Sequence, residues 1–149
     1  MPQSFSGIHV HLVFSTRDRE PYLDSHALRS ETHAYLGGIS KNLRCDPLIV
    51  GGVADHIHLL ARLGRTITVA DWVKELKRSS SVWAKTKGVP TFPWQAGYGA
   101  FSVGIEQIPT LKAYISRQEE HHHRSSFQDE FRQILREHGL EWDEQYVWD

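Results

Sequence analysis

The sequence predicts an α+β domain in which an antiparallel sheet carries helices on one face. Apolar and polar residues alternate over residues 8–15 and 56–63, which is the period of a half-buried strand. Shorter apolar segments at 48–52 and 98–103 add two further strands. Segments with helical spacing separate and follow the strands, in the order β-α-β-β-α-β-α with one more helix at the end. A split β-α-β arrangement, the ferredoxin-like topology, accommodates this order.

Each predicted helix has a recognisable beginning or end. The first spans about residues 25–43 and is followed by the helix-breaking pair Asp46-Pro47. Thr68 is a suitable N-cap for the second, and Gly88 with Pro90 ends it. The remaining two helices open at Pro109 and span about residues 127–138.

Length and composition predict a single domain over residues 1–149. The formal net charge is -1, so any contact with DNA requires a local basic patch. The single cysteine, Cys45, cannot form an internal disulfide and is typical of a reducing compartment. No apolar run approaches the roughly 18 residues of a membrane span. We therefore expect a cytoplasmic protein without a membrane partner.

The triplet His56-Ile57-His58 is the first candidate site. Residues two apart on a strand point to the same face, so both imidazoles leave one side of the sheet together. Pairs of imidazoles suit divalent metal ions. His9 and His11 form a second such pair, on the neighbouring strand and the same face. We assign the metal to His56 and His58, and expect His11 to orient a ligand or contact a phosphate.

Tyr114 and Gln118 form the second candidate site. They lie four residues apart in a segment that is predicted to be helical, so they share one helix face. A phenol and an amide oxygen beside a metal-binding histidine pair suggest cleavage of a phosphodiester by a tyrosine nucleophile.

Four segments extend this pattern over nearly the whole chain. They are His11–Arg19, Asp55–Leu60, Phe92–Gln95 with Gly97–Val103, and Tyr114–His122. Together they resemble the single-tyrosine transposases of the insertion-sequence-200 type, which include the REP-associated tyrosine transposases. The family more often has a proline where Ala54 stands and a lysine where Arg17 stands, and neither change affects the chemistry.

The resemblance implies a fold, a reaction and a set of partners. The fold would be ferredoxin-like and homodimeric, and the substrate would be single-stranded DNA folded into hairpins. His56 and His58 would bind Mg²⁺ or Mn²⁺, with Gln118 as a third ligand through its carbonyl oxygen. Tyr114 would attack a DNA phosphorus, giving a 5′-phosphotyrosine and a free 3′-hydroxyl. We expect the surrounding residues to be His11, Glu119 and His122.

Basic residues supply a candidate DNA surface. We expect them on the polar side of the second helix and on the loop after the first strand, where they could follow the phosphates. They are Arg17, Arg19, Lys74, Lys77, Arg78 and Lys85.

Two questions stay open at this point. The short connection 104–108 could carry the tyrosine helix across a two-fold interface, so we expect a site shared between two protomers, with a site within one chain as the alternative. The rival function is a catalytically silent DNA-binding regulator derived from such a transposase. A two-histidine phosphoesterase is disfavoured, because that class needs HxT or HxS motifs and both triplets here are HxH.

Overall fold

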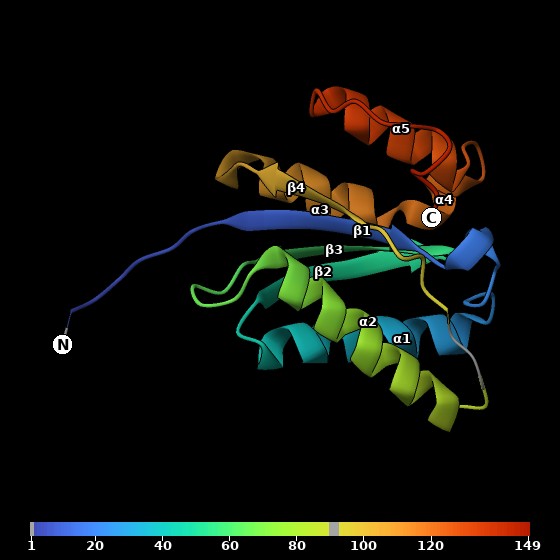
Figure 1. Ribbon diagram of the computed structural model, residues 1–149, viewed down its shortest axis with the longest axis horizontal. Coiled ribbons are helices and arrows are strands. Elements are labelled where there is room, and N and C mark those ends of the chain that lie inside the picture. Colours follow the sequence, from blue (N-terminus) through green and yellow to red (C-terminus); the bar gives the residue numbers. More distant parts are fainter. Residues whose placement is uncertain (1, 90–92) are drawn as a thin grey trace.

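A computed structural model describes residues 2–89 and 93–149 of the chain (Figure 1). Its four strands form one sheet in the order β2-β3-β1-β4, and all three pairs are antiparallel, which confirms the predicted arrangement. The strands are β1 (His9–Ser15), β2 (Asp46–Val53), β3 (His56–Arg62) and β4 (Gly99–Val103). Pro90, which is expected to end the second helix, and Phe92 of the third motif lie outside the described residues.

The helices cover both faces of the sheet. Figure 1 shows α1 and α2 on one side, and α3 and α5 on the other. The α-helices are α1 (His26–Asn42), α2 (Val69–Thr86), α3 (Ile108–Ser116), α4 (Gln118–His122) and α5 (Phe127–Glu137). Two short 3-10 helices are η1 (Arg17–Arg19) and η2 (Ile105–Gln107). No helix in the described part of the chain is long and apolar enough to cross a membrane.

N-caps fix the beginnings of the first two helices, and the cap of the second, Thr68, is the predicted one. Thr68 accepts a hydrogen bond from the Asp71 amide at 3.0 Å, and Ser25 accepts one from the Leu28 amide at 3.3 Å. Each cap satisfies a backbone donor that has no partner within its helix. Both helices therefore begin within one residue of the predicted positions.

The first hydrophobic core lies between the sheet and α1 and α2. Alternate residues of β1 and β3 face these helices, as the period of a strand requires. The fully buried members of this core include Leu12, Phe14, Ile57, Leu59, Leu36, Trp72 and Leu76. Trp72 also donates its indole N–H to the Ser40 hydroxyl at 3.0 Å, so its polar atom is satisfied inside the core.

A second core lies on the opposite face, under α5. It contains Val13 and Phe101 from the sheet, and Phe127 and Phe131 from α5. Helices are predicted on one face, with an added C-terminal nucleophile helix that carries Tyr114, and no element is predicted to cover the histidine face. The structure closes it, because the apolar stripe of α5 needs a surface to pack against. His56 and His58 are consequently buried completely.

Gly51 allows α3 to approach β2 very closely. A Cβ atom at this position would lie 2.7 Å from Cγ2 and 2.7 Å from the carbonyl oxygen of Ile115. Ile115 follows Tyr114 in α3 and is itself buried. The absence of a side chain at Gly51 therefore fixes the height of the tyrosine helix above the sheet.

Replacing Gly51 by alanine tests this close contact. Because the added methyl group meets the Ile115 backbone, we expect Gly51→Ala to lower the free energy of unfolding by about 1–3 kcal/mol. Gly38→Ala is the matched control, since Gly38 lies in α1 with open space around its Cβ position. There we expect a gain of about 0.5–1 kcal/mol. Urea denaturation measures both, and equal stability of the two variants would contradict the packing described.

Candidate active site

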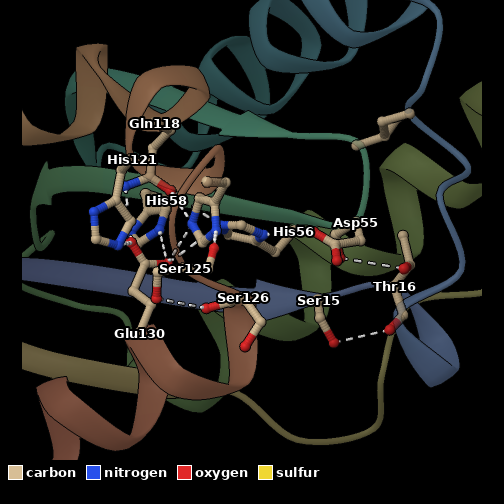
Figure 2. Close-up of polar contacts among 12 residues, drawn as sticks. Ser15, Thr16, Asp55, His56, His58, Gln118, His121, Ser125, Ser126 and Glu130 are labelled. Carbon is tan, nitrogen blue, oxygen red and sulfur yellow. Dashed lines mark hydrogen bonds and ion pairs between the residues drawn. The ribbon is translucent and has the colours of Figure 1, made fainter.

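His56 and His58 open β3, directly after the turn that joins it to β2. They pair with Ser15 and Val13 of β1, so both imidazoles leave the face that α5 covers. Figure 2 shows Gln118 and Glu130 pointing toward them. The strand period thus brings the predicted histidine pair together as expected.

The ring of His56 is held by a carboxylate on its far side. Its Nδ1 lies 2.7 Å from Asp55 Oδ1, so the Nδ1–H donates there. The Nε2 atom then faces Gln118 Oε1 at 3.0 Å and Glu130 Oε1 at 3.3 Å. Burial lowers the pKa of His56, but its hydrogen bonds to Asp55 and Glu130 outweigh burial and raise the pKa to about 9. A carboxylate-oriented imidazole is the usual form of a metal-ligating histidine.

His58 is oriented by a second imidazole. Its Nδ1 lies 2.8 Å from His11 Nε2, and its own Nε2 lies 3.0 Å from Glu130 Oε1. Burial and then the neighbouring His58 lower the pKa of His11 to about 3, so His11 is neutral at physiological pH. His11 therefore occupies the place expected for it, behind the histidine pair.

Glu130 of α5 is the functional residue that the sequence interpretation missed. It is 4% exposed, and its Oε2 accepts hydrogen bonds from the Tyr114 hydroxyl and, at 2.9 Å, from the Gln118 amide. Burial raises the pKa of this carboxyl, but hydrogen bonds from three imidazoles hold the pKa well below its usual range. The sequence does contain a signal, because Glu130 falls on the apolar stripe of α5 between Phe127 and Phe131. A carboxylate at a buried position needs partners.

Tyr114 and Gln118 meet at this carboxylate, although they do not share one helix. The predicted continuous helix is wrong: α3 ends at Ser116, Arg117 has φ -104° and ψ 22°, and α4 begins at Gln118. Burial and then the Glu130 charge raise the pKa of Tyr114 above its ordinary value. The phenol is therefore protonated, and its O–H donates a hydrogen bond to Glu130.

His122 and Glu119 differ from their predicted places. His122 enters the centre itself, with Nε2 at 3.0 Å from Gln118 Oε1 and 3.1 Å from Glu130 Oε1. Glu119 is directed away and forms an exposed ion pair with Arg29 at 2.7 Å. One residue along a helix rotates the side chain by about 100°, so Glu119 cannot face the same way as Gln118.

The whole site is assembled within one chain. After β4, the amide of Gly104 donates to Gln107 Oε1 at 3.0 Å and η2 forms, which returns α3 across β2 of the same sheet. Within this chain the 104–108 connection folds compactly, which is the alternative arrangement. A site shared between two protomers stays a prediction, since a single chain does not test it.

Two of the predicted DNA-binding residues hold the fold together. Lys77 donates to the carbonyl oxygens of Gln95 at 2.8 Å, Ala96 at 3.3 Å and Gly97 at 2.7 Å. Burial lowers the pKa of Lys77 to about 8. Arg19 donates to the Trp148 carbonyl at 2.6 Å. Both side chains donate hydrogen bonds to backbone carbonyls, so we correct their assignment as phosphate contacts.

The other four predicted DNA contacts divide between two sides of the molecule. Lys74, Arg78 and Lys85 belong to α2, on the layer opposite the histidines, and Arg78 pairs with Glu75 at 2.7 Å. Arg17 is exposed at the end of β1 beside the site, since the neighbouring Thr16 amide donates to the Asp55 carbonyl at 2.8 Å.

A groove gives access to the tyrosine. It lies between α3 and α5 and has a volume of about 980 Å³. Tyr114, Glu130, His11, His121 and Arg136 are among the residues that line it. The groove therefore reaches the Tyr114 side of the centre.

The His56–Asp55 contact makes stability depend on pH in the metal-free protein. Because the pKa of His56 rises from 6.5 to about 9 on folding, its stabilisation is complete below pH 6.5 and is lost as the pH rises through 9. We expect Asp55→Asn to cost about 1–3 kcal/mol at pH 6 and progressively less toward pH 10. Asp46→Asn, which removes an exposed ion pair with Arg62, is the control and should cost less than about 1 kcal/mol at either pH. Urea unfolding with a chelator present measures the difference, and a cost for Asp55→Asn that does not change with pH would refute this account.

Comparisons with known proteins identify the family. A family model described as "Transposase IS200 like" matches residues 4–118. No curated protein matches the chain. A Deinococcus radiodurans R1 protein described as a transposase has a similar structure, with 19% identity and a TM-score of 0.61 over 79% of this chain and 98% of that chain. A REP-associated tyrosine transposase bound to a REP hairpin is similar over 82% of this chain and 72% of that chain, with 12% identity and a TM-score of 0.60. The two structures support the fold, and because the family model covers most of the sequence, the chain belongs to the IS200-like transposase family.

Proposed function

We propose that the protein cleaves and rejoins single-stranded DNA through a covalent 5′-phosphotyrosine on Tyr114, with the assistance of a divalent metal ion. One observation carries the proposal. The two oxygens of Glu130 connect the Tyr114 hydroxyl on one side to the Nε2 atoms of His56 and His58 on the other. A nucleophile and a metal donor set are thus joined by one buried carboxylate.

The residues present fit a divalent ion. His56, His58 and Glu130 offer ligand atoms that all lie within 4.8 Å of one another. Gln118 adds its carbonyl oxygen, 3.0 Å from His56 Nε2. Lone pairs that face each other at such distances repel unless a proton or a cation lies between them. The carboxylate and the amide oxygen suit Mn²⁺ or Mg²⁺, and the imidazoles suit transition ions. A divalent ion held there would polarise a phosphoryl oxygen and neutralise developing charge.

The chain's own residues account for the proton. Attack by Tyr114 Oη on phosphorus requires that its proton leaves, and Glu130 Oε2 is the oxygen in contact with it. In the metal-free site the two pKa values oppose this transfer, and the positive charge of a bound divalent ion would favour the phenolate. The new O–P bond forms as the bond from phosphorus to the 3′ oxygen breaks. That oxygen then takes a proton from water and becomes the 3′-hydroxyl, while the phosphotyrosine conserves the bond for rejoining.

DNA hairpins are the substrate that we propose. One structure with the same fold is bound to a REP hairpin. In the present chain the groove between α3 and α5 is lined by Tyr114, and Arg17, which is exposed after β1, is the basic residue that we propose contacts phosphates. All the residues of the proposed site come from one chain here, and a homodimer, which the resemblance implies, would carry two such sites.

Replacing Tyr114 by phenylalanine tests the reaction. Because only the hydroxyl is removed, we expect Tyr114→Phe to abolish cleavage and the covalent adduct, and to leave hairpin binding within about twofold. Tyr98→Phe, at a 40% exposed tyrosine before β4, should retain both activities. The assay is a denaturing gel of 3′-labelled hairpin DNA incubated with protein and Mn²⁺.

The outcomes separate the two candidate functions. An adduct formed by Tyr114→Phe would move the nucleophile to another residue. Hairpin binding without any adduct in the unmodified protein would instead support the catalytically silent regulator.

A further inference from the structure

We propose that His122 is a third imidazole ligand of the metal centre, and that the centre therefore binds Zn²⁺ and Co²⁺ in preference to Mg²⁺. The inference rests on the metal centre of the proposed function and does not depend on its DNA chemistry.

Three imidazoles converge on one oxygen atom. The Nε2 atoms of His58, His122 and His56 lie 3.0 Å, 3.1 Å and 3.3 Å from Glu130 Oε1. His122 thus contacts the same oxygen as the predicted pair, although the ligand atoms that lie within 4.8 Å of one another form two sets that share Glu130, one with His56 and His58 and one with His121 and His122. The His122 side chain is 9% exposed, so the ring is nearly as enclosed as the other two.

The orientation of the His122 ring is that of a metal ligand. Its Nδ1 lies 2.6 Å from the Ser125 carbonyl oxygen, which can only accept, so this nitrogen carries a hydrogen. The Nε2 atom then faces two further acceptors, Gln118 Oε1 at 3.0 Å and Glu130 Oε1 at 3.1 Å. A neutral ring would set its lone pair against theirs, and a shared cation removes this repulsion. His56 shows the same pattern, with Asp55 in the place of the Ser125 carbonyl.

The local sequence explains why His122, and not His121 or His123, faces Glu130 Oε1. His122 follows Gln118 by four residues in α4, so both face the carboxylate. His121 is directed to the other oxygen of Glu130, with its Nε2 3.5 Å from Oε2. His123 is exposed to solvent. Only the middle histidine meets Glu130 Oε1 and Gln118 together.

This donor set determines which ions are favoured. Mg²⁺ prefers oxygen ligands and retains several waters. Imidazole nitrogen suits transition ions, for which affinity rises toward Co²⁺ and Zn²⁺. Three imidazoles with one carboxylate and one amide oxygen therefore bind these ions more tightly than a two-histidine site would.

The experiment compares His122→Ala with His123→Ala in the full-length protein after removal of metal. Calorimetry measures binding of Zn²⁺, Co²⁺ and Mg²⁺, and the visible absorption of Co²⁺ reports its ligands. We expect His123→Ala to match the unmodified protein, with one Co²⁺ bound even when Mg²⁺ is in large excess. Removal of an outer hydrogen-bonding partner typically lowers metal affinity 10- to 100-fold. We expect His122→Ala to lower the affinities for Zn²⁺ and Co²⁺ by at least this factor, and by about the same factor for both ions.

His122→Gln and circular dichroism guard against a folding defect. A folded His122→Gln variant with weakened Co²⁺ binding and a changed Co²⁺ spectrum supports the assignment. Unchanged Co²⁺ affinity in either His122 variant, or displacement of Co²⁺ by equal Mg²⁺, overturns it. The covalent adduct on hairpin DNA is scored separately, so the inference on the metal can fail while the proposed function stands, and the reverse.

Discussion

The buried carboxylate of Glu130 is the constraint on which the second layer of the protein depends. An isolated charge in a protein interior is costly unless hydrogen bonds and opposite charges surround it. Here the compensating groups come from β3, α3 and α4, while α5 supplies the carboxylate itself. They are His56, His58, His122, Gln118 and Tyr114. The position of α5 over the sheet, and of the tyrosine beside the histidines, follows from satisfying this one group.

The two faces of the sheet are consequently stabilised in different ways. Under α1 and α2 the contacts are almost entirely apolar, and the few polar atoms such as the Trp72 indole have single partners. Under α5, apolar packing around Phe101 and Phe131 gives way to a polar network around Glu130. The apolar half of this layer provides stability. The polar half instead surrounds one buried carboxylate with imidazole, phenol and amide groups.

Local patterns in the sequence predicted the scaffold but only part of the site. The alternation in β1 and β3 gave the sheet, its neighbours and the shared face of His11, His56 and His58, because strand period is a local property. Glu130 was missed because its importance arises from tertiary contacts with residues more than 70 positions away, such as His58. The break at Arg117 was missed as well, since four-residue spacing fits a continuous helix equally well.

The contacts of the basic residues were likewise not predictable from the sequence. Lys77 and Arg19 carry the positive charge expected of a DNA-binding surface, yet each donates hydrogen bonds to backbone carbonyls of distant loops. A sequence states the charge of a side chain but not the groups that it contacts. Six basic residues that appear equivalent along the chain therefore separate, in three dimensions, into structural cations, an opposite-face group and Arg17.

The order of the site residues along the chain has a consequence for biosynthesis. The histidine pair and the tyrosine belong to the part that matches the family, whereas Glu130 lies after residue 118, where that match ends. Translation therefore makes Tyr114 before the carboxylate that accepts its hydrogen bond. A chain whose synthesis stops before α5 contains Tyr114, His56 and His58 but lacks the carboxylate that contacts all three.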